Sequence, residues 1–270
     1  MRGGRTMRIL NSMLIAFSMY SKIPVPAVEW KKENMRYVMC FFPLVGTVLG
    51  FLYTGLFLLC RALGIGQILS AVLLTLLPVL LSGGIHMDGL MDTMDALGSY
   101  QSREKKLEIL KDSRAGAFAV LSCGCYLLLS FGQNSEFFAL LSGDAPGTYR
   151  SLLVLALGFT VSRAFSGLSV VSFPCAKSSG LAAGFSETAV KRAVKITMGM
   201  FLAVCAVLMF VLSPGAAAGM WLAALLSFWY YHRMSGKEFG GITGDLAGFF
   251  LQVCELVMMT GWLIGFRLCL

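Results

Sequence analysis

The chain has 270 residues, of which 57% are hydrophobic and only 13% charged, and its formal net charge is +8. A soluble globular protein carries roughly 25% charged residues, so this composition excludes that class and indicates an integral membrane protein. We expect no nucleic-acid partner either, because no basic stripe alternates with aromatic residues.

The N-terminal segment, residues 1–21, predicts an interfacial or half-inserted helix. Arg2, Arg5 and Arg8 precede an apolar stretch of about a dozen residues, which is too short to span a bilayer comfortably. No small-residue cleavage site follows it, because the chain continues into Ile23-Pro24-Val25-Pro26, so a signal peptide is not expected. The arginines would hold the helix at the membrane surface and so make the lipid bilayer a partner.

Seven longer apolar runs predict seven transmembrane helices. Each has about twenty residues, the length that a helix needs to cross a bilayer, and none alternates polar and apolar residues as barrel strands do. We therefore expect an all-α, polytopic transmembrane helix bundle that forms one integral membrane domain over residues 1–270. The seven runs cover residues 37–60, 66–85, 115–133, 150–172, 194–213, 215–232 and 246–266.

The uneven distribution of basic residues predicts the orientation of this bundle. With residues 86–114 in the cytoplasm, most lysines and arginines fall inside and few fall outside, as the positive-inside rule requires. Residues 173–193 and 233–245 then face the cytoplasm as well. Because the polar loops gather on one side, we expect an active site that faces the cytoplasm.

Residues 86–114 form the candidate active-site segment, which begins with three spaced aspartates. Asp88, Asp92 and Asp95 lie on one face of a helix over two turns. Three like charges on one face repel one another, and Mg²⁺ is a cation that carboxylates hold together with substrate phosphates. A solvated acidic face is the alternative, but the position next to an apolar run favours a Mg²⁺ site. His86 is a candidate base or phosphate partner.

Basic residues near this segment are candidates for phosphate binding. Lys111 and Arg114 precede the third run, where Arg114 either presents a donor fork to a phosphate or anchors the helix. Arg163 lies about nine residues inside the fourth run, roughly 13 Å deep at 1.5 Å per residue. An intramembrane arginine costs about 2.5–3.5 kcal/mol, so it either faces an anionic substrate or pairs with Glu255 at a similar depth.

Two further segments complete the candidate set. In residues 240–245, Thr243 or Asp245 could cap the last helix, whereas the three glycines indicate close approach to a ligand or another helix. Asp245 has the membrane depth of Asp88, so it could complete the metal site. Residues 172–185 form a small, cationic loop around Lys177, which suits a substrate lid and equally suits an ordinary connector.

Four separated motifs, in the same order, resemble those of one known family. The block from residue 83 to 95 resembles the signature of the cobalamin-5′-phosphate synthases, also called adenosylcobinamide-GDP ribazoletransferases. The similarity extends over most of the chain, although Ala96 replaces a usual second glycine and the loop at Lys177 follows the pattern only loosely. The other matching segments are residues 23–26 with 42–46, residues 111–116 and residues 240–245.

The resemblance implies a transferase in the inner membrane of a bacterium, with a fold distantly like that of CDP-alcohol phosphotransferases. Its substrates would be adenosylcobinamide-GDP and α-ribazole or α-ribazole 5′-phosphate, it would release GMP, and it would require Mg²⁺. On this hypothesis Asp88 and Asp92, with Asp245, hold the metal, and Asp95 or else His86 takes the proton of the attacking hydroxyl. Substrate binding would fall to Arg114, Lys111, Arg163, Lys177 and Thr243.

Two other functions are compatible with the same residues. One is a CDP-alcohol phosphotransferase of lipid synthesis, although Leu90-Met91-Asp92 does not follow the alanine and arginine of that consensus. The other is a divalent-cation transporter, which would carry its acids near the bilayer midplane rather than at the cytoplasmic edge. A homo-oligomer is also compatible with the sequence.

Overall fold

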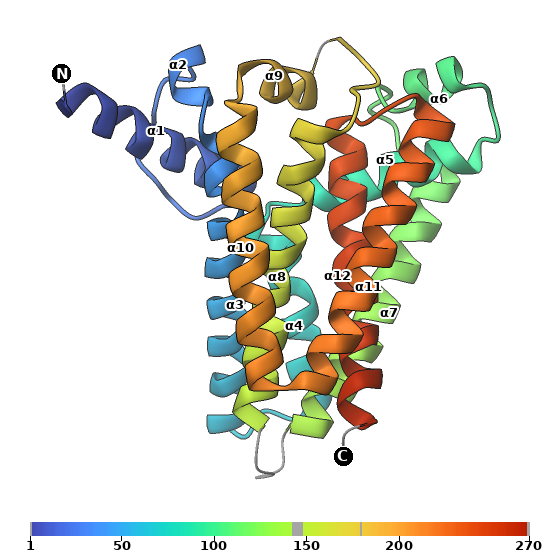
Figure 1. The fold of residues 1–270 in the computed structure, drawn as a ribbon. Coiled ribbons are helices and arrows are strands. Elements are labelled where there is room, and N and C mark those ends of the chain that lie inside the picture. Colours follow the sequence, from blue (N-terminus) through green and yellow to red (C-terminus); the bar gives the residue numbers. More distant parts are fainter. Residues whose placement is uncertain (1, 142–147, 179, 269–270) are drawn as a thin grey trace.

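The computed structural model describes residues 2–141, 148–178 and 180–268, and their regular structure is helical. One isolated β-bridge joins Cys175 to Ile242. The predicted all-α class is therefore confirmed. Figure 1 shows a bundle of long helices with several short helices gathered at one end, which we call the loop end.

The described helices divide into a bundle and a cover at the loop end. The bundle contains α3 (Val38–Ala62), α4 (Gln67–Leu81), α7 (Ala117–Leu141), α8 (Thr148–Ser172), α10 (Lys191–Leu212), α11 (Pro214–Met234) and α12 (Gly244–Arg267). The loop end carries α1 (Arg2–Tyr20), α2 (Lys32–Met35), α5 (Ile85–Gly98), α6 (Arg103–Ile109), α9 (Leu181–Thr188) and the π-helix η1 (Ser235–Phe239). The N-terminal segment thus forms one helix, α1, which lies beside the bundle rather than within it (Figure 1).

Five helices are long and apolar enough to cross a membrane, namely α3, α7, α8, α10 and α12. The bent pair of α4 and α5 makes up to six. Helix α11 is not among these candidates, but it runs the length of the bundle beside α12 (Figure 1). Each of the seven predicted apolar runs therefore corresponds to a helix of the bundle, and a seven-span arrangement fits the fold.

The second span ends earlier than the sequence predicts. Helix α4 stops at Leu81 instead of continuing to residue 85, and the backbone of Gly83 and Gly84 is left-handed, with φ of 64° and 80°. Glycine adopts this conformation without a steric penalty. The chain therefore turns, and the axis of α5 lies 89° from that of α4. The acidic helix consequently crosses the bundle at the loop end.

Small residues allow the bundle helices to pack closely. A Cβ atom on Gly46 or Gly50 of α3 would collide with the backbone carbonyls of Phe159 and Ala156 on α8. Gly219 of α11 and Gly261 of α12 face each other in the same way. Such contacts stabilise helix pairs in lipid, where the hydrophobic effect does not drive association. They hold the frame on which the loop-end helices rest.

Candidate active site

Helix α5 is held against α12 by two facing glycines. A Cβ atom on Gly89 would lie 2.5 Å from the carbonyl oxygen of Asp245, and one on Gly248 would lie 3.2 Å from that of His86. Only residues without a side chain permit this approach. Gly89, which follows Asp88 in the acidic motif, therefore allows α5 to pack against the first turn of α12, where Asp245 lies.

Four carboxylates share this contact region. Asp88 and Asp245 line one cavity. The charges of Asp88, Asp245 and Asp95 all act on Asp92. In the described part of the chain, none of the four forms a salt bridge with a basic side chain. The cluster therefore gathers carboxylates without an ion-pair partner and favours a cation.

The donor set fits Mg²⁺ only as an incomplete site. Among the described residues, no three His, Cys, Asp or Glu side chains are arranged to hold a metal ion by themselves. Mg²⁺ is commonly held by one or two carboxylates together with substrate phosphates and water, so a complete protein cage is not needed. Asp88 and Asp92, one helical turn apart, supply hard oxygen donors of this kind.

Asp95 has a structural role that the sequence did not indicate. Its Oδ2 accepts a hydrogen bond of 2.7 Å from the backbone N–H of Gly116, and its Oδ1 accepts one of 3.3 Å from Ala119. These donors lie at the start of α7, so the carboxylate caps that helix. A Cβ atom on Gly116 would collide with it. Both oxygens are thus engaged, which does not suit the predicted role of general base.

Lys111 and Lys177, predicted to bind substrate, meet at a cavity of about 270 Å³ that Thr243 and Asp245 also line. We call it the lysine cavity. Burial lowers the pKa of Lys177, the charge of Lys111 lowers it further, and Asp245 opposes the shift. Thr243 caps α12, since its Oγ1 accepts from Leu246 N–H at 3.2 Å, and the same hydroxyl donates to Asp245 Oδ2 at 3.3 Å.

The loop that carries Lys177 is fixed to residues 240–245 by backbone pairing. The N–H of Ala176 donates to the carbonyl of Ile242 at 2.9 Å, and the N–H of Ile242 donates to Pro174 at 2.8 Å. Gly241 is required here, because a Cβ atom would collide with the carbonyl of Pro174. The predicted gathering of polar segments at one end is therefore confirmed.

In the segment before α7, Lys111 lines the lysine cavity but Arg114 does not. The Arg114 side chain is 87% exposed, and its Nε and Nη2 donate to Asp112 at 3.0 and 2.8 Å. It does not line the lysine cavity, to which Lys111 belongs. Of the two predicted phosphate ligands in this segment, the structure brings only Lys111 to the candidate site.

Arg163 lies deep in the bundle and adopts the alternative that the sequence left open. Its guanidinium pairs with Glu255, whose Oε1 also accepts from Ser162 Oγ at 2.9 Å. The Arg163 residue is only 2% exposed. Pairing compensates the cost of burying both charges, so this geometry favours a structural role over substrate binding.

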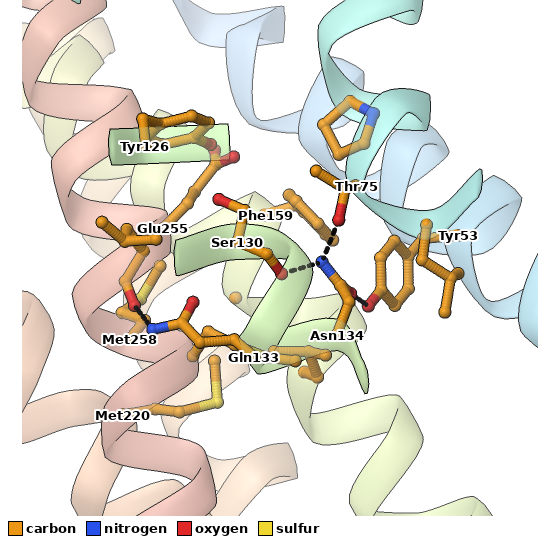
Figure 2. Close-up of a pocket in the computed structure, with 16 residues that line it drawn as sticks. Tyr53, Thr75, Tyr126, Ser130, Gln133, Asn134, Phe159, Met220, Glu255 and Met258 are labelled. Atoms are coloured by element: carbon orange, nitrogen blue, oxygen red, sulfur yellow. Dashed lines mark hydrogen bonds between the residues drawn. The ribbon is translucent and has the colours of Figure 1, made fainter. Parts of the chain in front are cut away.

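Near this ion pair, a small cavity of about 60 Å³ lies within the bundle (Figure 2). Three of its polar side chains bond to one another, because Asn134 accepts from Tyr53 and donates to Thr75 at 3.1 Å. Gln133 donates to Thr260 at 2.7 Å. Among the predicted site residues, none lines this cavity.

His86 lines a third cavity, of about 280 Å³, which also contains Asp88 and Asp245. We call it the aromatic cavity, because Tyr20, Phe42 and Phe185 line it too. These three rings come from α1, α3 and α9. The sequence did not identify them, because in isolation each looks like an ordinary apolar residue; only their meeting in the fold distinguishes them.

Comparisons with known proteins identify the family to which this chain is similar. The model of the family described as cobalamin-5-phosphate synthase matches residues 12–263. A protein of Lachnoclostridium phytofermentans called adenosylcobinamide-GDP ribazoletransferase is 50% identical over 251 residues, covering 93% of this chain and 92% of its own. Proteins with the same name from Desulfitobacterium hafniense and Clostridium perfringens are 36% and 33% identical, covering 93% and 89% of this chain and 96% and 92% of their own. No solved structure matches.

Proposed function

The chain belongs to the cobalamin-5-phosphate synthase family, and from this premise we propose that it is an adenosylcobinamide-GDP ribazoletransferase. The observation that supports this best is the meeting of two cavities at Asp245, one lined by Lys111 and Lys177 and one lined by Asp88 of α5. Phosphate transfer needs both cations for the diphosphate and carboxylates for metal and proton. The excess of basic residues supports the proposal that this end faces the cytoplasm. The family membership supports the proposal that the bundle lies in the inner membrane of a bacterium.

In the proposed reaction, a ribose hydroxyl of α-ribazole or of its 5′-phosphate attacks the phosphorus that is bonded to cobinamide. A new P–O bond forms, the bond from this phosphorus to the bridging oxygen breaks, and GMP leaves with that oxygen. The hydroxyl proton passes to the Asp245 carboxylate, which lies where the cavities adjoin. Asp245 replaces Asp95 as the base, because Asp95 caps α7.

The remaining residues bind and orient the donor. Asp88 and Asp92 would hold Mg²⁺, which would supply positive charge to the transferred phosphate. Lys111 and Lys177 hold the diphosphate in the lysine cavity, where charge neutralisation lowers the barrier to attack. Thr243 positions Asp245 through its hydroxyl.

The structure offers less support for the transporter alternative. A divalent-cation path needs free carboxylates near the bilayer midplane, but Glu255, which lies at mid-depth in α12, is paired with Arg163. The aspartates that favour a cation lie at the loop end. The family match also favours ribazole transfer over CDP-alcohol transfer.

The test is a product assay with purified protein in detergent. Adenosylcobinamide-GDP and α-ribazole 5′-phosphate are supplied with and without Mg²⁺, and GMP and cobamide are measured together. We expect equal amounts of both products, only with Mg²⁺, and no inhibition by CDP-diacylglycerol. Folded protein that forms no cobamide, or that transfers from the CDP-lipid instead, would refute the assignment. A parallel assay with free α-ribazole measures which acceptor is preferred.

A further inference from the structure

The aromatic cavity has the lining of a site for a flat ring. Tyr20 and Phe42 have ring centroids 4.2 Å apart, and the rings of Tyr20 and His86 are stacked 6.2 Å apart with an interplanar angle of 21°. Phe185 lies 6.5 Å from Tyr20. Aromatic rings attract one another in offset-stacked or edge-on arrangements, so this lining favours an aromatic occupant.

One polar atom in this cavity has no partner. His86 is 5% exposed, and among the described residues its Nε2 finds no hydrogen-bond partner. A buried donor or acceptor without a partner is destabilising, and this one belongs to a residue that lines a cavity, so it points to a ligand that completes it. An acyl chain would leave this nitrogen unpaired, whereas a heterocycle with a ring nitrogen would not.

We infer that the aromatic cavity holds the base of the acceptor nucleoside, a two-ring benzimidazole-type heterocycle whose free ring nitrogen accepts a hydrogen bond from His86 Nε2–H. This inference rests on the proposed function and names the subsite for one of its two substrates. The other ring nitrogen carries the ribose, so the sugar extends from the cavity. Asp88 and Asp245 line the same cavity, which brings the ribose hydroxyl to the proposed base.

The same arrangement separates the two substrates. The lysine cavity and the aromatic cavity share Ala182, Gly244 and Asp245. The nucleoside then approaches Asp245 from the aromatic side and the diphosphate from the lysine side. His86 and the rings of Phe42 and Phe185 therefore determine which bases are accepted, while Lys111 and Lys177 act on the donor.

A binding cycle tests the hydrogen bond directly. The dissociation constants of α-ribazole and of its indole analogue, in which C–H replaces the free ring nitrogen, are measured by calorimetry for wild type and His86→Phe. Wild type should bind α-ribazole about tenfold more tightly than the analogue, which is the value of one buried hydrogen bond. His86→Phe keeps an aromatic ring but removes the donor, so the two ligands should bind it equally.

Several controls keep the test decisive. His232→Phe changes the other histidine of the chain, an exposed residue packed on Phe173, and should preserve the tenfold discrimination. His86→Gln keeps a side-chain N–H donor, so it should retain part of the difference in affinity between α-ribazole and its analogue. Phe185→Leu removes a stacking ring, so the affinity for both ligands should fall several-fold. The affinity for adenosylcobinamide-GDP should stay unchanged in all four variants.

The outcomes separate this inference from the function on which it rests. Three results would overturn the assignment of the cavity. The first is that His86→Phe still binds α-ribazole more tightly than the analogue, and the second is that it loses affinity for both ligands equally. The third is that phospholipid displaces α-ribazole from the wild type. A wild type that turns over α-ribazole without discriminating the analogue would overturn it as well. A wild type that neither binds nor converts α-ribazole would overturn the proposed function itself.

Discussion

The interior of the bundle and its loop end differ in how their charged groups are compensated. In the interior, Glu255 pairs with Arg163, and Asn134 is bonded to both Tyr53 and Thr75. At the loop end, Asp88 and Asp92 form no salt bridge in the described part of the chain, and His86 Nε2 has no partner there. Charged groups that pair with each other stabilise the fold, whereas carboxylates without an ion-pair partner are available to bind a cation. Changes in the interior should therefore affect stability, and changes at the loop end should affect turnover.

The largest effect on turnover is expected for Asp92→Asn. Loss of a metal ligand removes several kcal/mol of transition-state stabilisation, so GMP release should fall about 10³-fold. Stability in detergent should not fall, because the substitution relieves repulsion from three other carboxylates. Asp112→Asn, an exposed aspartate paired with Arg114, is the matched control and should remain active. Equal loss in both variants would contradict the comparison.

The largest effect on stability is expected for Glu255→Gln. It leaves the Arg163 charge buried and uncompensated, which costs about 3–5 kcal/mol of unfolding free energy. Denaturant unfolding in detergent measures this loss, and Arg163→Met combined with Glu255→Leu should recover much of it. Turnover per folded molecule should change little. A folded Glu255→Gln protein without activity would place the ion pair in the reaction instead.

Gly89→Ala should separate α5 from α12 and reduce turnover by about a hundredfold, because the added Cβ would lie 2.5 Å from the Asp245 carbonyl. A displacement of about 1 Å is enough for such a loss. Gly124→Ala on α7 is the control, since no atom lies within 4 Å of its added Cβ. Kinetics of GMP release compare the two. Full activity of Gly89→Ala would show that the close contact does not position the site.

Asp95→Asn tests the helix cap against the role of base. Asn keeps only one of the two acceptor oxygens, so the substitution should cost about 1 kcal/mol of stability, the value of one hydrogen bond, and turnover should fall by less than tenfold. The pH dependence of turnover should keep its shape. Abolished turnover in a stable variant, with binding of adenosylcobinamide-GDP intact, would return the base assignment to Asp95.

The sequence predicted those parts of the site that depend on local spacing and membrane depth. The common face of Asp88 and Asp92 follows from the helical repeat. The proximity of Asp245 to Asp88 follows from equal depth in neighbouring helices. The class of fold follows from the length and number of apolar runs.

The parts of the site that the sequence did not predict depend on contacts between distant segments. Asp95 is held by backbone groups at Gly116 and Ala119, which no local pattern relates to it. The aromatic cavity requires Tyr20 and Phe185, which are far apart in the chain. The choice between pairing and substrate binding for Arg163 required the rotation of α8 relative to α12, which depth alone does not define.

The most direct test of the account is the binding of Mn²⁺, as a paramagnetic substitute for Mg²⁺, in the presence of adenosylcobinamide-GDP. Electron paramagnetic resonance measures bound Mn²⁺ in wild type, Asp92→Asn and folded Glu255→Gln. The account predicts that binding is lost in Asp92→Asn and retained in Glu255→Gln. Mn²⁺ that remains bound in Asp92→Asn, or that is lost in Glu255→Gln, would show that the carboxylates at the loop end are not the metal site.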